Sequence, residues 1–180
     1  MLEDRCLLKR LHGGDKDALR QIYEKYIDDL FRVATSLLSD VQSAEDCLHD
    51  VFVNFAGSVD ELRACSNIKK YLVSCVANRA RDMLRKKAKR SDCQNEQLAS
   101  TKISYNPVSQ LIAAEESARL FSSLTELPYQ QREVFVLHVQ GGLKFREIAD
   151  LLDLSINTVQ SRYRYGIQKL REVLEKGERK

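Results

Sequence analysis

The stretch that decides the fold is LKFREIADLLDLSINTVQSRYRYGIQKL, residues 143–170. Its apolar residues recur at helical spacing, first around Ile148 and again around Val159. Between these two segments Leu154 fills a tight turn, and the Ser155 hydroxyl is placed to accept a hydrogen bond from the next helix's first turn. A short helix, a tight turn and a longer helix in this order predict a helix-turn-helix.

The second helix of this motif has the side chains that DNA binding requires. Between residues 155 and 171 there are four basic side chains and no acidic one. The face opposite Val159 is predicted to read base edges, while the remaining cations hold phosphates. The predicted DNA-binding residues of this helix are Gln160, Ser161, Arg162, Arg164, Tyr165 and Lys169. The alternative is a surface helix with an ordinary solvated basic face.

The composition indicates a helical chain. Hydrophobic residues make up 43% of the 180 residues, and only two prolines and seven glycines occur. No apolar run approaches the length of about 18 residues that a membrane span needs, so no membrane insertion is expected. The N-terminus lacks the apolar core of a signal peptide, which predicts a cytoplasmic protein.

The cysteines and histidines do not suggest a metal site. Five cysteines occur without a CxxC pair, and the three histidines are scattered. We expect reduced thiols, no metal and no cofactor. No phosphate-binding glycine loop and no catalytic triad pattern occurs either, so an enzyme is not expected.

The pattern predicts an all-α protein of two small helical domains, at residues 1–90 and 109–180, joined by a flexible linker at residues 91–108. Asp15 is expected to cap a long helix that ends near Leu38, and Ser43 to cap the next one. The polar linker has no helical period and ends at Asn-Pro. The two domains are expected to fold separately. The remaining helices are predicted at 2–11, 67–90, 109–124, 128–140, 144–152 and 155–174.

Charge is distributed unevenly along the first domain. Residues 1–67 carry 8 basic and 13 acidic side chains, whereas residues 68–90 carry 9 basic and 1 acidic side chain. A concentrated basic face attracts a phosphate backbone. The residues of this segment predicted to bind DNA are Lys70, Asn78, Arg81, Arg85 and Lys86. The alternative is a solvated basic surface.

Both halves resemble bacterial sigma factors of the sigma-70 family. In the second half the similarity lies in Leu127-Pro128, Arg132-Glu133-Val134, Glu147-Ile148-Ala149 and the run from Thr158 to Arg162. In the first half it lies in Gly14-Asp15, in Ala44-Glu45-Asp46 with Val51-Phe52, and in Asn78, Asp82 and Arg85. The domain that usually separates the two halves is absent, which is typical of the extracytoplasmic-function type.

The resemblance implies a sigma factor that binds core RNA polymerase and directs promoter-specific initiation. It implies that the helix at 68–90, with the loop at 57–67, engages the downstream promoter element and assists strand opening. The C-terminal domain would read the upstream element. An anti-sigma factor is implied as a further partner. The polymerase-binding residues implied by the resemblance are Asp46, His49, Asp50 and Asn54.

Several positions depart from the family pattern. Lys144 replaces the usual Ser or Thr cap, Asp153 replaces the turn glycine, and His49 replaces Gln. Residues 163–166, Tyr-Arg-Tyr-Gly, replace a Leu-His-Arg-Ala type of run. Two other functions remain open from the residues alone. They are a helix-turn-helix regulator with a sensing or dimerising N-terminal domain, and an RNA-binding helical module.

Overall fold

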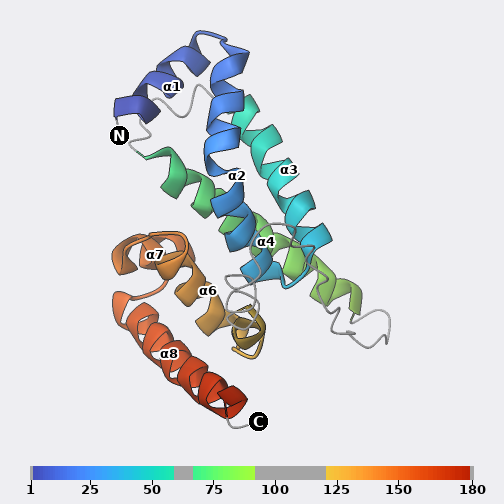
Figure 1. The fold of residues 1–180 in the computed structure, drawn as a ribbon, viewed down its shortest axis with the longest axis vertical. Helices are drawn as coiled ribbons and strands as arrows, with labels where there is room; N and C mark the ends of the chain where they lie inside the picture. Colours follow the sequence, from blue (N-terminus) through green and yellow to red (C-terminus); the bar gives the residue numbers. More distant parts are fainter. Residues whose placement is uncertain (1, 59–66, 92–120, 179–180) are drawn as a thin grey trace.

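The computed structural model describes residues 2–58, 67–91 and 121–178, and every regular element in these ranges is an α-helix (Figure 1). The predicted all-α class is therefore confirmed. The predicted linker, beyond Ser91, and most of the helix expected at 109–124 lie outside the described residues. The described helices are α1 (Leu2–His12), α2 (Lys16–Leu38), α3 (Val41–Gly57), α4 (Ile68–Ser91), α6 (Tyr129–Val139), α7 (Phe145–Leu152) and α8 (Ile156–Glu178).

Most helix starts follow the sequence signals, but the start of α3 does not. Asp15 caps α2 as predicted, and the Asn67 side chain accepts a hydrogen bond at the start of α4. The prediction that Ser43 caps α3 is wrong, because Asp40 is the cap and accepts a hydrogen bond from the Ser43 N–H. Ser39 ends α2 in the left-handed conformation (φ 57°), so the chain reverses there and α3 begins within two residues.

The first four helices pack around α2, which contacts α1, α3 and α4. Ile22 and Leu30 of α2 are fully buried, as are Phe55 of α3 and Leu72 of α4 at 2% and 0% exposure. Burying a side chain of this size contributes about 1.5–3 kcal/mol. Cys47 lies in this core with its thiol directed at a backbone carbonyl, so it acts as a small apolar side chain.

The last three helices form a second bundle, in which α6 and α7 both pack on α8. Ile148 of α7 and Val159 of α8 are completely buried, as their positions in the motif predict. Leu137 of α6 lies in the same apolar cluster. The helix-turn-helix is thereby fixed onto α6 and has one free face on α8.

The two bundles also pack against each other, which the expectation of separately folding domains did not anticipate. α6 lies against the end of α2 and against α4 (Figure 1). The Arg132 guanidinium of α6 donates hydrogen bonds to the Ser39 hydroxyl at 2.8 Å and to the Leu37 carbonyl at 3.3 Å. At the end of α6, the backbone of Gly141 closely approaches the Val73 side chain of α4.

None of the helices in the described ranges is long and apolar enough to cross a membrane. Within the same ranges, no three His, Cys, Asp or Glu side chains gather as a metal site would require.

Candidate nucleic-acid interface

The turn between α7 and α8 has the geometry that a helix-turn-helix requires. Asp153 takes a left-handed conformation (φ 53°, ψ 50°), so an aspartate serves where glycine is usual. The Leu154 N–H then donates to the Ala149 carbonyl at 3.0 Å. The Ser155 hydroxyl accepts from the Thr158 N–H at 3.1 Å, as the sequence predicts.

The start of α7 is stabilised in an unusual way. The Lys144 side chain cannot accept a hydrogen bond, so the usual side-chain cap is missing. Instead the Glu147 carboxylate accepts from the Lys144 N–H at 2.6 Å, which is one half of a capping box. Partial burial raises the pKa of Glu147, but the hydrogen bonds from Lys144 and Lys70 outweigh this effect and hold it below its usual value.

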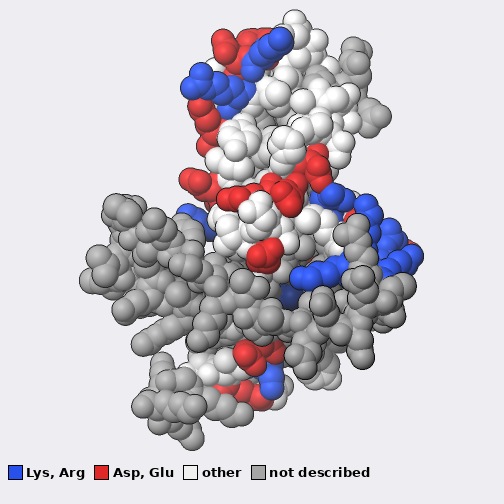
Figure 2. Space-filling view, turned by 90° about the vertical axis from the view of Figure 1, so that its right-hand side faces the viewer, with Lys and Arg blue, Asp and Glu red and all other residues white. Residues whose placement is uncertain are grey.

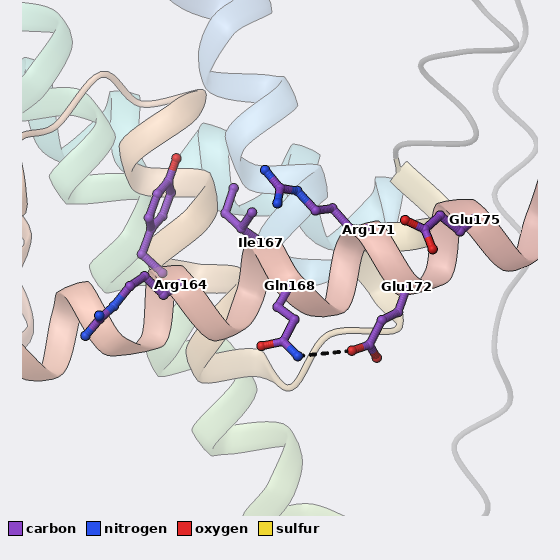
Figure 3. Close-up of a pocket in the computed structure, with 7 residues that line it drawn as sticks. Arg164, Ile167, Gln168, Arg171, Glu172 and Glu175 are labelled. Carbon is purple, nitrogen blue, oxygen red and sulfur yellow. Dashed lines mark hydrogen bonds between the residues drawn. The ribbon is translucent and has the colours of Figure 1, made fainter.

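Most of the predicted DNA-binding residues of α8 lie on its exposed outer face. Gln160, Arg164, Tyr165 and Lys169 are exposed, and Ser161 is half-buried beside them. The close-up of the groove along α8 shows Arg164 pointing away from the side on which Ile167 and Arg171 lie (Figure 3). These side chains are therefore free to meet a groove of DNA.

Arg162 differs from the other predicted residues of α8. It is half-buried, and its charge offsets part of the rise in the pKa of Glu133 that burial of this carboxylate causes. Arg162 thus compensates a buried charge as well as facing the surface.

Two residues of the unusual 163–166 run have opposite roles. The Tyr163 ring packs inward against the rings of Phe145 and His138, with centroids 5.1 Å and 5.0 Å away. His138 and Phe145 stack on each other at 4.3 Å, so the three rings join α6, α7 and α8. Tyr165 is instead 63% exposed. Tyr163 orients the helix, and Tyr165 is available to a ligand.

Ile156, which was not among the predicted DNA-binding residues, is 43% exposed at the start of α8. It lies four and eight residues before Gln160 and Arg164, so the three side chains share one stripe of the helix. The available signal was an apolar residue directly after the Ser155 cap, outside the buried pattern of the motif.

The predicted DNA-binding residues of α4 fall into two groups. Asn78, Arg85 and Lys86 are exposed, while Lys70 and Arg81 are partly covered by the C-terminal half. In the space-filling view, Lys and Arg side chains gather at one edge, next to a band of Asp and Glu (Figure 2). α4 therefore presents a basic face, but some of its cations already pair with carboxylates.

The two covered cations meet carboxylates from the C-terminal half. The Lys70 ammonium lies 2.7 Å from the Glu147 carboxylate, and the Arg81 guanidinium lies 3.0 Å from that of Glu133. The Glu133 side chain is only 5% exposed, and this burial raises its pKa. The Tyr129 hydroxyl also donates to Glu133, at 3.1 Å.

Residues 22–90 match the family model of sigma-70 region 2, and residues 117–170 match that of sigma-70 region 4. The two matches together cover more than half of the chain. The chain belongs to the sigma-70 family. Members of this family are not enzymes, and they direct promoter-specific transcription initiation with RNA polymerase.

Relatives of similar length identify the subgroup. The chain is 25% identical to the ECF RNA polymerase sigma factor SigW of Bacillus subtilis, covering 93% of this chain and 94% of that one. It is 23% identical to the ECF RNA polymerase sigma-E factor of Haemophilus influenzae, covering 97% and 94%. The match with these ECF sigma factors over nearly the whole chain identifies it as an ECF member of the sigma-70 family.

Solved structures share the fold. One is the sigma factor RpoE in complex with the anti-sigma factor NepR from Bartonella quintana, with a TM-score of 0.70, 22% identity, and coverage of 87% of this chain and 98% of that one. The other is CnrH in complex with the cytosolic domain of CnrY, with a TM-score of 0.68, 24% identity, and coverage of 96% and 97%.

In this sigma-70 member, the four residues of α3 assigned to polymerase binding have different surroundings. Asp46, His49 and Asn54 are exposed. Asp50 is half-buried and accepts a hydrogen bond from the Arg79 guanidinium of α4 at 2.8 Å. Asp50 therefore supports the packing of α3 on α4, and its carboxylate is already paired.

A groove of about 510 Å³ lies between α2 and α3, next to these residues. His49 lines it together with apolar side chains from both helices, and Val53 is 57% exposed there. Tyr23 of α2 is 45% exposed and also lines the groove. An exposed apolar groove of this kind is typical of a protein-binding surface.

Proposed function

We propose that the chain acts in the cytoplasm, where it binds core RNA polymerase and selects promoters with two DNA-binding faces. The exposed face of α8 reads the upstream element, and the basic face of α4 engages the downstream element. The single observation that carries this proposal is the helix-turn-helix whose last helix presents an acid-free outer face between residues 155 and 171.

On α8, base reading and phosphate binding are assigned to different side chains. Gln160 and Arg164 extend from the outer face toward base edges, where Gln favours adenine and Arg favours guanine. Ser161 lies beside them. Ile156, at the end of the helix that enters the major groove, contacts a thymine methyl group. Lys169, farther along the helix, holds a phosphate.

On α4, the cations supply affinity, and Asn78 supplies a base contact. Asn78 is exposed between Lys70 and Arg81 on the same side of the helix. Arg85 and Lys86 extend the charge toward the end of the helix. Together with the preceding loop, which lies largely outside the described residues, this face binds the downstream element as its strands separate.

The docking surface for polymerase is centred on the groove between α2 and α3. The groove supplies apolar area through Tyr23 and Val53, while His49, Asp46 and Asn54 supply polar contacts around it. An apolar centre with a polar rim is the usual anatomy of a protein interface. Asp50 contributes by holding α3 on α4.

An anti-sigma factor is proposed as a second protein partner. Both solved neighbours named above are sigma factors bound to another protein, one of them described as an anti-sigma factor. The exposed groove of α2 and α3 is available to such a partner in the free chain. The two partners would then compete for one surface.

The test is run-off transcription with purified core polymerase on a library of promoters with randomised upstream and downstream elements. The expected result is transcription from a subset of sequences that share two conserved elements. Arg164→Ala should change the upstream element only, and Asn78→Ala the downstream element only. Binding to DNA without stimulation of core polymerase would instead support a conventional helix-turn-helix regulator, and tight binding to RNA without polymerase would support an RNA-binding module.

A further inference from the structure

Asn157 is an exposed residue at the start of α8 that was not among the predicted DNA-binding residues. α8 begins at Ile156, so Asn157 is its second residue. The N-terminal turns of the second helix are the part of a helix-turn-helix that enters the major groove. The Cα–Cβ bonds of a helix tilt toward its N-terminus, so the Asn157 side chain extends toward this end of α8.

Asn157 faces away from the core of the C-terminal half. Val159, two residues later, is completely buried, and two residues of a helix turn through about 200°, so the two side chains lie on nearly opposite sides of α8. Arg164 follows seven residues after Asn157, which is within about 20° of two full turns. Arg164 points away from the side on which Ile167 lies (Figure 3). Asn157 and Arg164 therefore share the outward face of α8.

The start of α8 does not use the Asn157 amide as a cap. Ser155 is the cap, because its hydroxyl accepts a hydrogen bond from the Thr158 N–H at 3.1 Å and lies 2.8 Å from the Thr158 hydroxyl. Within the described residues, the Asn157 amide has no hydrogen-bond partner. Both its N–H group and its oxygen are therefore free to bind a ligand.

Two other exposed amides on the DNA-facing helices are already engaged. The Asn78 oxygen accepts a hydrogen bond from the Arg81 guanidinium at 2.7 Å, and the Gln168 amide donates to the Glu172 carboxylate at 3.3 Å (Figure 3). The free amide of Asn157 offers a donor and an acceptor side by side. In the major groove, adenine presents the matching pair, which is the N7 acceptor and the N6 amine.

We propose that Asn157 is a specificity-determining residue that reads an adenine of the upstream element, donating to N7 and accepting from the N6 amine. Seven residues of a helix advance by about 10 Å, so Asn157 and Arg164 address different base pairs. This inference rests on the function proposed above, because it requires α8 to read the upstream element.

The test is run-off transcription from a library randomised in the upstream element, with core polymerase and full-length wild type, Asn157→Ala or Gln168→Ala. Wild type should prefer adenine at one position, and Asn157→Ala should lose that preference. The discrimination lost should be about 5- to 150-fold, the range for one paired hydrogen-bond contact. Gln168→Ala is the matched control, because it removes an exposed amide three turns farther along the same helix. It should keep the preference.

A base analogue distinguishes a base contact from an effect on the fold. The promoter selected by wild type is prepared with 7-deazaadenine, which lacks the N7 acceptor, at the preferred adenine. This replacement should weaken promoter binding by the wild-type and Gln168→Ala holoenzymes. It should weaken binding by Asn157→Ala no further, because the partner of N7 is already absent. Tm should be nearly equal for the three chains, since Ser155 supplies the cap.

Three results would overturn the proposal. The first is a wild-type upstream element in which no adenine preference depends on Asn157. The second is a uniform weakening of all upstream sequences by Asn157→Ala, which would place the amide on a phosphate. The third is additive losses from Asn157→Ala and 7-deazaadenine. A wild-type holoenzyme without any upstream preference would instead refute the proposed function and this inference together, so the two failures are distinguishable.

Discussion

Asp50 has two candidate roles, which are to hold α3 on α4 through Arg79 and to contact polymerase directly. Exchanging the charges of Asp50 and Arg79 distinguishes these two roles. The Arg79 guanidinium contacts one oxygen of the Asp50 carboxylate through two nitrogens, so Asp50→Arg both breaks the pair and places two cations together. The side chains of Arg79 and Asp50 are 29% and 41% exposed, so solvent weakens the attraction. We expect the pair to contribute about 1 kcal/mol and the reversal to cost about 1–2 kcal/mol in unfolding free energy.

For a chain of this length that loss lowers Tm by about 2–8 °C. Urea unfolding followed by circular dichroism measures the loss of unfolding free energy, and thermal unfolding measures the change in Tm. Asp50→Arg, Arg79→Asp and the double exchange are each compared with wild type. The double exchange should recover most of the lost stability, because the pair is rebuilt with reversed polarity. Asp46→Arg is the control, since Asp46 is exposed on the same helix and should leave Tm nearly unchanged.

Polymerase binding is then measured for the same variants at a temperature where all are folded. If Asp50 acts only by holding α3 on α4, the double exchange recovers binding together with stability. Recovered stability without recovered binding would show instead that Asp50 contacts polymerase directly. An unchanged Tm for Asp50→Arg, with no coupling between the two positions, would refute the structural role.

Four further predictions follow from the described contacts. Arg164→Ala should relax selection at one upstream position, and Lys169→Ala should weaken all promoters alike, as promoter selection from a randomised library would show; identical logos for wild type and Arg164→Ala would refute the first assignment. Ile156→Ala should abolish any loss of affinity caused by replacing thymine with uracil in the upstream element; a loss equal to that of wild type would exclude a methyl contact. Lys144→Ser should raise the free energy of unfolding by about 1 kcal/mol in urea denaturation by supplying the missing cap; no gain would mean that Glu147 already satisfies α7. Hydrogen bonds from Ser43 hold the pKa of Asp40 below its usual value, so the ionised Asp40 carboxylate stabilises the folded protein at neutral pH, and this stabilisation is lost as pH falls through the folded-state pKa. Tm of wild type should therefore fall more steeply than that of Asp40→Asn between about pH 5 and about pH 2. Parallel curves of Tm against pH would contradict this prediction.

Local sequence signals predicted most of the fold because each depends on a few neighbouring residues. The Ser155 cap, the left-handed Asp153 and the buried Val159 are all set within one motif. The start of α3 was misplaced because two capping candidates, Asp40 and Ser43, stand three residues apart. The choice between them depends on where α2 ends, and the tight reversal left only Asp40 at the junction.

The candidate site was only partly predictable because several of its side chains are paired across long sequence separations. A helical period shows which residues lie on one face, but it does not show what covers that face. Asp50 was assigned to polymerase binding, and its partner Arg79 lies 29 residues away on another helix. Tyr23 fits the apolar period of α2 and yet lines an open groove, because no described helix covers that part of its surface.

The charge counted along the sequence therefore overstates the unpaired positive charge that α4 presents to DNA. Residues 68–90 contain nine cations, but Lys69, Lys70, Arg79 and Arg81 each pair with a carboxylate from another helix. Two of these carboxylates, Asp29 and Asp50, belong to the same half as α4. The other two belong to the C-terminal half. Lys70 and Arg81, the two cations that lie on either side of Asn78, are therefore paired across the two halves of the protein.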